Sequence, residues 1–561
     1  MEYYVCDFET TTAPDDCRVW AFACCNVYDV DELYYGIDID SFITWIYTKC
    51  GSRLYFHNLG FDGAFIMDYL ERTGWKWTDD NKSVENKTYN TLISDMNQLY
   101  SITLIFGRGK RVVIWDSLKV IPLSVREMAR SYGLEEGKGE LDYEEFRPVG
   151  HELTDLERDY IRRDVQVVAN VLRMFLDKGL TKMTAGANAL HDFKAIIGGD
   201  NAFRVIYPIL SDTEDSFIRR AYRGGFTYAA PRYQGREVGE GIVLDVNSLY
   251  PSVMHCCDGQ SMPYGVPVWF DGEPGEDERH PLWVACITLS FRVKPRHIPC
   301  LQLKGCPRFV STQYVEESEG PVTIVVTNVD WELIKQQYDI WGVDFDGGYR
   351  FKASSNQFIK YVDKWTEEKI NAAREGNRGK RQIAKLMLNS LYGKFATRRK
   401  LVSRKPVLRK DSDTVFYEDA VEDEKDGVYL PVGVFVTAWA RFKTISACQS
   451  VYDRFLYADT DSMHLLGKEY PENIDIDEYK LGAWKVESEF SRAKFLRAKC
   501  YIESLEGEEG LTVHIAGMPE NVRGQVNYDN FDLGAQYEGK LYQKRVPGGI
   551  VLEPGLMQLR K

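Results

Sequence analysis

Tyr457-Ala-Asp459-Thr-Asp461-Ser462 is the stretch that decides the fold. The segments on either side, Phe455-Leu-Tyr and Met463-His-Leu, have the pattern of two paired strands, which predicts a tight turn that carries both acids. Carboxylates on such a turn suit Mg²⁺, a hard ion that prefers oxygen ligands. Because an Asp-x-Asp turn alone is usually only a solvated hairpin tip, other residues must decide between these interpretations.

A second acid follows a buried strand elsewhere in the chain. The apolar run at 241–244 leads into Asp245, and Pro251 restricts the backbone just past Tyr250. Asp245 and Asp461 can therefore hold two metal ions, as phosphoryl transfer requires.

Polar residues between these two acids recur at spacings of three and four. On a helix this spacing predicts a single stripe that can grip a triphosphate. The residues of the stripe are Arg378, Arg381, Lys385, Asn389 and Tyr392.

Taken together, these segments resemble the polymerase motifs of the protein-primed family B DNA polymerases, and most of all those of the terminal-protein-primed replicases of small linear-genome Bacillus phages. The matching segments are Asp245-x-x-Ser-Leu-Tyr250-Pro, Lys385-x3-Asn389-Ser-x-Tyr392-Gly393 and Tyr457-x-Asp459-Thr-Asp461-Ser462. Tyr222-Arg-Gly224-Gly225 is similar to the family's link between exonuclease and polymerase domains, and Lys499-Cys-Tyr501 to its primer-holding motif. The resemblance covers nearly the whole chain. It implies an α/β and α+β multidomain protein, in which an RNase H-like 3′–5′ exonuclease domain precedes a right-hand polymerase domain of palm, fingers and thumb.

The resemblance also implies a role for each residue of the polymerase site. Asp245, Val246 and Asp461 are the implied metal ligands, with Asp459 as a nearby catalytic acid. The implied nucleotide-binding residues are Tyr250, Lys369, Arg381, Lys385, Asn389 and Tyr392. The implied DNA-binding residues are Asn58, Phe65, Tyr222, Gly224, Gly225, Ser248, Gly393, Lys499 and Tyr501.

The first 200 residues contain a separate group of acids. Asp7 and Glu9 lie two apart in a predicted strand and so share a face, and Asp62 lies near the start of an apolar helix. A capping box, Thr154-x-x-Glu157, opens a helix on which Tyr160 and Asp164 are four apart.

Four acids and a tyrosine fit a two-metal 3′–5′ exonuclease, in which Asp7, Glu9, Asp62 and Asp164 bind the metals and Tyr160 orients the water. This set matches the family's proofreading pattern. Lys138 stands where the family has a lysine that assists at the scissile phosphate, and a solvated loop lysine is the alternative interpretation.

These motifs divide the chain into predicted segments. We expect an exonuclease domain at 1–185, a helical linker at 186–225 that ends in Tyr-Arg-Gly-Gly, and the palm in two parts, 226–299 and 433–490. The fingers are expected at 356–397 and the thumb with the C-terminal segment at 491–561. The resemblance implies that 300–355 contacts a terminal protein and that 398–432 is a strand-displacement arm, whereas ordinary loop elaboration would be the interpretation without it.

Composition fits a large enzyme without identifying it. The 561 residues suffice for several domains, and 44% are hydrophobic without an apolar run of about 18, so we expect no membrane span. The opening Met1-Glu-Tyr-Tyr-Val enters a strand directly, so we expect no signal peptide. The twelve cysteines lack paired zinc-ligand spacing, which favours free thiols in a reducing cytoplasm.

Charge is distributed unevenly along the chain. The net charge is −14, but residues 369–410 hold 14 Lys or Arg against Glu375 alone. A basic strip on an acidic body binds a DNA backbone along one route, although a charged run is often only a solvated face. After Tyr501 the thumb is poorer in lysine than the family pattern, so we expect weaker contacts with DNA there.

The function that we predict is template-directed DNA polymerisation with 3′–5′ proofreading, primed by a terminal protein, processive and strand-displacing. The expected cofactor is Mg²⁺, for which Mn²⁺ can substitute, with two ions per active site. Expected partners are primer-template DNA, single-stranded DNA, dNTPs and a terminal protein, for a phage-encoded monomer or heterodimer in the bacterial cytoplasm. The alternatives are a repair or plasmid polymerase that uses a nucleic-acid primer, or a non-catalytic DNA-binding scaffold, against which the intact acids of both sites argue.

Overall fold

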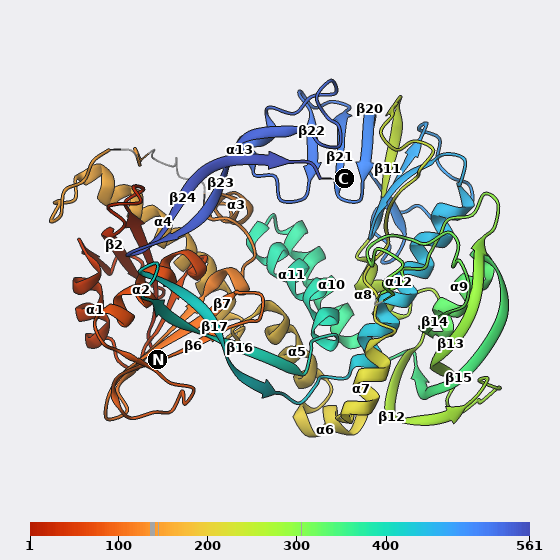
Figure 1. Cartoon of the computed structure of the whole chain (residues 1–561), viewed down its shortest axis with the longest axis horizontal. Helices are drawn as coiled ribbons and strands as arrows, with labels where there is room; N and C mark the ends of the chain where they lie inside the picture. The colour runs from red at the N-terminus through yellow and green to blue at the C-terminus, as the bar shows by residue number, and fades with distance from the viewer. Residues whose placement is uncertain (135–140, 144, 305, 561) are drawn as a thin grey trace.

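The computed structural model of the chain describes residues 1–134, 141–143, 145–304 and 306–560. Lys138 falls outside these ranges. In Figure 1 the elements follow an arc, from the N-terminal part through the helices at the bottom to the strands on the right and at the top. Among the described residues, no helix combines the length and apolar character that a membrane crossing needs.

The N-terminal part is built on a mixed sheet. Strand β1 pairs in parallel with β4 and β4 with β8, while β2 and β3 extend the sheet as an antiparallel edge. Its strands are β1 (Tyr3–Thr10), β2 (Val19–Asn26), β3 (Leu33–Gly36), β4 (Arg53–Phe56), β5 (Lys76–Trp77), β6 (Asn86–Ile93), β7 (Leu99–Phe106) and β8 (Arg111–Asp116). The helices of this part are α1 (Ile39–Thr48), α2 (Leu59–Arg72), the 3-10 turn η1 (Ser117–Lys119), α3 (Val125–Tyr132) and α4 (Asp155–Asp177).

A distant hairpin joins this same sheet. Strands β16 (Lys400–Arg409) and β17 (Thr414–Glu424) add to its β6 edge through the pair Arg404 and Ile93. The predicted arm at 398–432 is thus docked on the N-terminal part rather than free, and α12 (Leu430–Ser450) begins before its predicted end.

The predicted linker at 186–225 is helical, as expected. Its helices are α5 (Ala185–Ile196), α6 (Gly199–Ile206) and α7 (Asp212–Arg219).

The second sheet carries the acids of the deciding stretch. Its order is β22-β21-β20-β11-β19-β18-β9, with β10 beside β20. The strands are β9 (Thr227–Ala229), β10 (Glu237–Val238), β11 (Gly241–Val246), β18 (Phe455–Asp459), β19 (Ser462–Leu466), β20 (Trp484–Arg497), β21 (Cys500–Leu505) and β22 (Thr512–Ile515). The predicted hairpin around Asp459 and Asp461 is therefore confirmed as β18 and β19.

A third sheet includes strands from both sides of residue 299, where the boundary between the first part of the palm and the segment 300–355 was expected. Strands β12 (Met262–Asp271) and β13 (Leu282–Val293) do not join the second sheet but pair with β14 (Val322–Thr327) and β15 (Tyr338–Ser354), with α9 (Asn328–Gln337) between the last two. The predicted first part of the palm thus spans two sheets, because the segment 300–355 supplies the hydrogen-bonding partners of β12 and β13.

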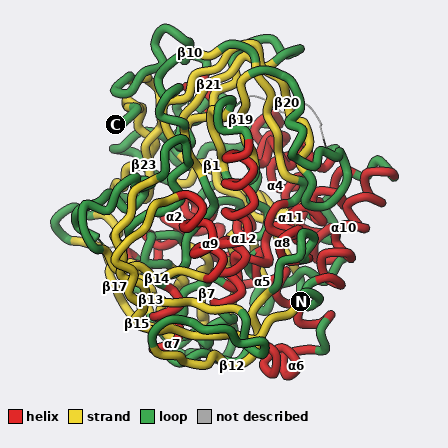
Figure 2. The backbone as a smooth tube through the Cα atoms, turned by 90° about the vertical axis from the view of Figure 1, so that its right-hand side faces the viewer, coloured by secondary structure: helices red, strands yellow, loops and turns green. Residues whose placement is uncertain are grey.

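Helices occupy the middle of the molecule. Figure 2 shows α8 (Leu249–His255), α11 (Arg378–Phe395) and α12 between strand-rich regions above and below, and α11 packs on α10 (Ile359–Arg374), α8 and α12. Their apolar faces belong to the largest core cluster, with Ile383, Met387 and Phe435 buried in it.

The chain ends in a long hairpin. Strands β23 (Gln536–Val546) and β24 (Gly549–Gln558) follow the short helix α13 (Glu520–Arg523) and reach back to the N-terminal part, as Figure 1 shows. There Gly549 lies against Phe65 of α2, and Cys17 Sγ lies 3.7 Å from the carbonyl oxygen of Ile550.

Candidate active sites

Two adjacent strands bring Asp245 and Asp461 together. Asp245 on β11 faces Ser462 on β19, and the Val246 amide donates to the Asp461 carbonyl oxygen at 2.8 Å. Burial, followed by the charges of Asp461 and Glu487, raises the pKa of Asp245 to about 7. The pair thus concentrates negative charge in a partly buried place, which a divalent cation would stabilise.

Asp459 lies two positions before Asp461 but has different partners. Lys499 Nζ lies 2.7 and 3.0 Å from its two carboxylate oxygens, and the Thr227 hydroxyl donates to it at 3.2 Å. Thr460 between the two acids has a φ of 64°, a left-handed conformation that turns the backbone between them. Asp459 is thus paired with a cation, whereas Asp461 lies beside Asp245.

Cations gather beside these acids. Burial lowers the pKa of Lys369, and Lys485, Arg381 and Lys385 lower it further by repulsion. Lys485 Nζ lies 3.6 Å from Asp245, and Lys369 Nζ lies 3.5 Å from the Ser248 hydroxyl. A cluster of amines and a guanidinium next to two acids has the charge pattern that a metal-bound triphosphate needs.

The predicted polar stripe on α11 is present. Arg378, Arg381, Lys385 and Asn389 are exposed and Tyr392 is half-buried, whereas the opposite face of the helix is buried.

Two tyrosines from different helices form the wall of this site. The rings of Tyr250 on α8 and Tyr392 on α11 stack with centroids 3.9 Å apart and planes 20° from parallel. A Cβ at Gly225 would lie 2.7 Å from Thr460 Cγ2 and 3.0 Å from Tyr250 Oη, so only glycine fits there. The link Tyr222–Gly225 is therefore packed against the site.

The second group of acids converges in the N-terminal part. Burial and the charges of Asp62, Glu9 and Asp164 hold the pKa of Asp7 well above its ordinary value. Burial also raises the pKa of Asp62 to about 7. Acids from β1, α2 and α4 are thus close enough to repel one another, and carboxylates are the ligands that Mg²⁺ prefers. Even so, no three His, Cys, Asp or Glu side chains of the described ranges are gathered tightly enough to hold an ion in their present positions.

The sequence did not reveal two neighbours of this group. The Tyr143 hydroxyl lies 2.8 Å from that of Tyr160, and the buried Asp116 accepts from the Asn58 amide at 3.0 Å. Asn58 is left-handed at φ 70°. Tyr143 belongs to no recognisable sequence motif, so the sequence alone did not indicate it.

Two of the residues predicted to bind DNA, Phe65 and Tyr501, have buried side chains. The Phe65 side chain is 2% exposed and packs against Gly549, so it contacts the terminal hairpin rather than solvent. Tyr501 is 8% exposed, and its ring stacks on His514 with centroids 4.5 Å apart, whereas Lys499 is well exposed.

A buried charge cluster behind the deciding hairpin was also missed. His464 Nδ1 lies 3.4 Å from Glu503 Oε2, and His514 Nε2 lies 3.5 Å from Glu503 Oε1. Although burial opposes ionisation, the two imidazoles lower the pKa of Glu503 to about 2. The cluster joins β19, which follows the deciding turn, to β21 and β22, which follow Lys499.

The basic strip is partly neutralised within its hairpin. Arg399 lies 3.1 Å from Glu424 and Arg404 lies 3.1 Å from Asp419, both across the β16–β17 pair. The strip therefore offers fewer cations to DNA than its sequence suggests, whereas those on α11 face outward.

The twelve cysteines are free, and most of them are buried, as expected from their spacing.

A family model and several known proteins match this chain along most of its length. The model for DNA polymerase type B, organellar and viral, matches residues 43–152 and 139–478. The chain is 43% identical over 580 residues to the DNA polymerase of Bacillus phage Nf, with 99% of each covered. It is 42% identical over 572 residues to the DNA polymerase of Bacillus phage phi29, with 98% of this chain and 97% of that one covered. The solved structure of Phi29 DNA polymerase with primer-template DNA and incoming nucleotides superposes at a TM-score of 0.94, with 40% identity over the whole of both chains.

Proposed function

The chain belongs to the organellar and viral type B DNA polymerases, and from this premise we propose that it is a protein-primed replicase of a linear phage genome, with 3′–5′ proofreading and strand displacement. The relatives that match nearly its whole length are phage polymerases, so the protein acts in a bacterial host, and we place it in the cytoplasm.

One observation supports the polymerase chemistry most directly. Asp245 and Asp461 form a partly buried acidic pair beside Lys369, while Lys499 pairs with Asp459 instead. In the proposal, Asp245, Asp461 and the Val246 carbonyl hold two Mg²⁺ ions, which would activate the primer 3′-hydroxyl and stabilise the leaving pyrophosphate. Lys369, Arg381, Lys385 and Asn389 bind the triphosphate, and Tyr250 and Tyr392 pack the sugar and base.

Proofreading is assigned to the acids of the N-terminal part. Asp7, Glu9, Asp62 and Asp164 would hold the metals of this second site, and the hydroxyl pair of Tyr160 and Tyr143 would position the attacking water. Lys138 remains a proposed contact to the scissile phosphate.

The domain assignments follow from the observed elements. We assign the exonuclease to 1–185, the palm to strands β9, β10, β11, β18, β19 and β20 of the second sheet, and the fingers to α10 and α11. The third sheet and its loops form the proposed contact with a terminal protein, the β16–β17 hairpin the strand-displacement arm, and the segment after β20 the thumb.

The test separates the two activities. Asp461→Ala should abolish primer extension and leave the degradation of single-stranded DNA, whereas Asp7→Ala with Glu9→Ala should do the reverse. Both variants are compared with wild type on a primed circular template, with and without an unpaired 3′ end. Loss of both activities in a folded variant would contradict the assignment of two sites.

Protein priming needs its own assay. A protein-primed enzyme should transfer dAMP covalently to a hydroxyl of a candidate terminal protein, and the product is detected as a labelled protein band. Extension of DNA primers without this transfer would favour the nucleic-acid-primed alternative.

A further inference from the structure

Lys485 is a cation of the polymerase site that lies outside the predicted nucleotide-binding set. It pairs with Asp245 across the antiparallel strands β20 and β11, so the two side chains project from the same face of the sheet. Its Nζ lies 3.6 Å from Asp245 Oδ1, and the lysine and acid side chains remain 33% and 21% exposed. Burial raises the pKa of Asp245 most, Asp461 and Glu487 raise it further, and Lys485 is the cation that lowers it.

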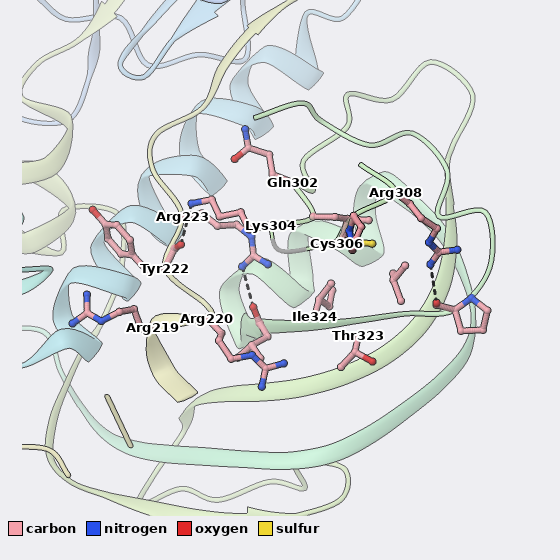
Figure 3. A pocket seen from close by; sticks show the side chains of 15 residues that line it. Arg219, Arg220, Tyr222, Arg223, Gln302, Lys304, Cys306, Arg308, Thr323 and Ile324 are labelled. Atoms are coloured by element: carbon pink, nitrogen blue, oxygen red, sulfur yellow. Dashed lines mark hydrogen bonds between the residues drawn. The ribbon is translucent and has the colours of Figure 1, made fainter. Parts of the chain in front are cut away.

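Another concentration of positive charge lies near the site but does not serve Asp245. Figure 3 shows it around a cavity of about 720 Å³, between the end of α7, the loop after residue 301 and β14. Of its arginines, Arg223 donates to the Val325 carbonyl oxygen at 3.0 Å, and Arg219 pairs with Asp215 at 2.9 Å. Lys485 is therefore the direct counter-ion of Asp245.

Two lysine–carboxylate pairs at the polymerase site differ in how firmly they are held. Lys499 Nζ lies 2.7 and 3.0 Å from the two carboxylate oxygens of Asp459, as charge-assisted hydrogen bonds do. The 3.6 Å between Lys485 and Asp245 is longer than such a bond, so charge attraction holds this pair without a directed hydrogen bond. Lys485 can therefore change its partner at small cost, whereas Lys499 is committed to Asp459.

Lys485 has a second charged neighbour, the amine of Lys369 on α10. Burial lowers the pKa of Lys369, and repulsion from Lys485 is the largest contribution from a neighbouring charge. Two amines that approach each other from β20 and α10 are stabilised by an anion between them. Asp245 supplies part of this negative charge, and the phosphates of a nucleotide would supply more.

We propose that Lys485 couples metal binding to nucleotide binding: its amine neutralises Asp245 in the free enzyme and binds the triphosphate in the loaded enzyme. The inference rests on the proposed polymerase function and adds an order of events to it. While the amine lies beside Asp245, its charge opposes the binding of a divalent cation there. A nucleotide draws the amine to its phosphates and frees Asp245 as a ligand. Coupling is reciprocal, so the same factor applies to nucleotide affinity.

The first experiment measures Mn²⁺ binding directly, through the electron paramagnetic resonance of free Mn²⁺. All proteins carry Asp7→Ala with Glu9→Ala, which removes two proposed ligands of the second site. Without DNA or nucleotide, Lys485→Met should bind Mn²⁺ about fivefold or more tightly than the protein that retains the lysine. Lys480→Met is the matched control, because this exposed lysine before β20 pairs with Asp475 at 2.6 Å. It should leave Mn²⁺ binding unchanged.

The second experiment measures the coupling. A primer-template that ends in a dideoxynucleotide is added with the matching dNTP, and affinity is expressed against free Mn²⁺, corrected for the metal that the nucleotide itself binds. The dNTP should raise the Mn²⁺ affinity when Lys485 is present, and this factor should be about fivefold or more smaller in Lys485→Met. Lys485→Arg keeps the charge and should restore most of the coupling. Without the changes at Asp7 and Glu9, Lys485→Met should degrade single-stranded DNA normally, which shows that it is folded.

Other outcomes overturn the inference. Unchanged or weaker Mn²⁺ binding in Lys485→Met would show that the amine does not oppose metal binding at Asp245. A loss of dNTP affinity that is equal at all Mn²⁺ concentrations would make Lys485 a phosphate contact without coupling. If wild type failed to extend primers, the proposed function itself would be wrong. If wild type extended them and Lys485→Met bound Mn²⁺ as the unchanged site does, only the coupling would be wrong.

Discussion

The two acids of the deciding turn, Asp459 and Asp461, have different neighbours. They are two positions apart, yet the left-handed Thr460 gives them different neighbours: Lys499 holds Asp459, and Asp245 lies beside Asp461. A sequence pattern can indicate that both acids are useful. It cannot show which one is already paired with a cation.

Tyr250 provides a prediction at this scale. Its ring is fixed flat against Tyr392 at 3.9 Å, so we expect it to lie beneath the incoming sugar, where a 2′-hydroxyl would collide with it. Tyr250→Val should therefore increase the incorporation of ribonucleotides relative to deoxynucleotides by about tenfold or more, equivalent to about 1.4 kcal/mol of lost discrimination.

The measurement is the ratio of kcat/KM for each rNTP and its dNTP. Tyr250→Phe keeps the ring and should retain the preference of the wild type. An unchanged preference in Tyr250→Val would locate the sugar gate elsewhere, with Tyr392 as the next candidate.

The sequence predicted those site residues that belong to one local pattern. Asp245, Asp7 and Glu9 lie within strands that are legible in the sequence, and Asp461 lies in the turn between two predicted strands, β18 and β19. Tyr143, Asp116 and the His464 cluster were not predictable, because each acquires its role only through contacts with segments far along the chain. The family resemblance assigned Phe65 to DNA, and nothing local in the sequence reveals that the chain's last hairpin covers it.

At the scale of elements, helix α4 begins as its capping box predicts. Glu157 accepts from the Thr154 amide at 2.9 Å, and the structure adds bonds from Arg147 Nε and His151 Nε2, both at 2.8 Å. Although burial opposes ionisation, these partners lower the pKa of Glu157 to about 2. The helix that bears Tyr160 and Asp164 is thus anchored by a buried ion pair.

Glu157→Gln should loosen this helix. Removing one partner of a buried pair costs about 3–5 kcal/mol, because Arg147 is left buried without its carboxylate. Since the folded pKa lies below the ordinary value, the stabilisation by Glu157 is fully present above about pH 4.5 and is lost as pH falls towards 2. Hydrogen exchange of α4 should therefore be faster in the variant at neutral pH, and the difference should narrow below pH 4.5.

Asp159→Asn is the control on the same helix, since its carboxylate is 41% exposed and its ion pairs with Arg162 and Arg163 lie near the surface, where such pairs add little stability. It should leave the exchange of α4 nearly unchanged. Equal exchange in wild type and Glu157→Gln at neutral pH would contradict the anchoring role.

Most elements near the sites were predictable, but their long-range pairing was not. Strands β1, β11, β18 and β19 and helices α4 and α11 follow from local periodicity. The pairing of β16 with β6 joins segments about 300 residues apart, and the union of β12 and β13 with β14 and β15 depends equally on distant partners. Period and turn chemistry act locally, so they cannot select among distant strands.

At the scale of the whole molecule, three separate segments meet on the N-terminal part. Arg72 of α2 binds the Asp413 carboxylate at 2.9 Å at the tip of the β16–β17 hairpin. Arg545 of β23 donates to the Val415 carbonyl oxygen at 2.7 Å and stacks over Tyr417. The two hairpins and α2 therefore form one continuous junction, across which the ends of the arc in Figure 1 are joined.

The arm supplies the prediction at this scale. Replacing about residues 402–428 with a short Gly-Ser linker removes most of β16 and β17 and with them one side of the junction. Extension on single-stranded template should be retained, whereas synthesis should stop at a downstream duplex and products should shorten under a DNA trap. Product lengths on gapped and primed circular templates measure both effects.

A double substitution that leaves the arm in place is compared with the deletion. Arg72→Ala with Arg545→Ala keeps the arm but removes its polar anchors, and it should shorten products under the trap while it retains part of the strand displacement. If the trimmed enzyme copied long duplexes without interruption, the arm would have no part in strand separation.

The junction of the two hairpins has a consequence for how the protein meets DNA. No covalent bond closes it, and its Arg72–Asp413 ion pair is exposed, so this contact weakens as ionic strength rises. A free end of linear DNA could be threaded past a closed junction, but a covalently closed circle can be loaded only when the junction opens. The rate of loading onto circular DNA should then increase with salt more steeply than the rate of loading onto linear ends, because moderate salt favours opening of the junction.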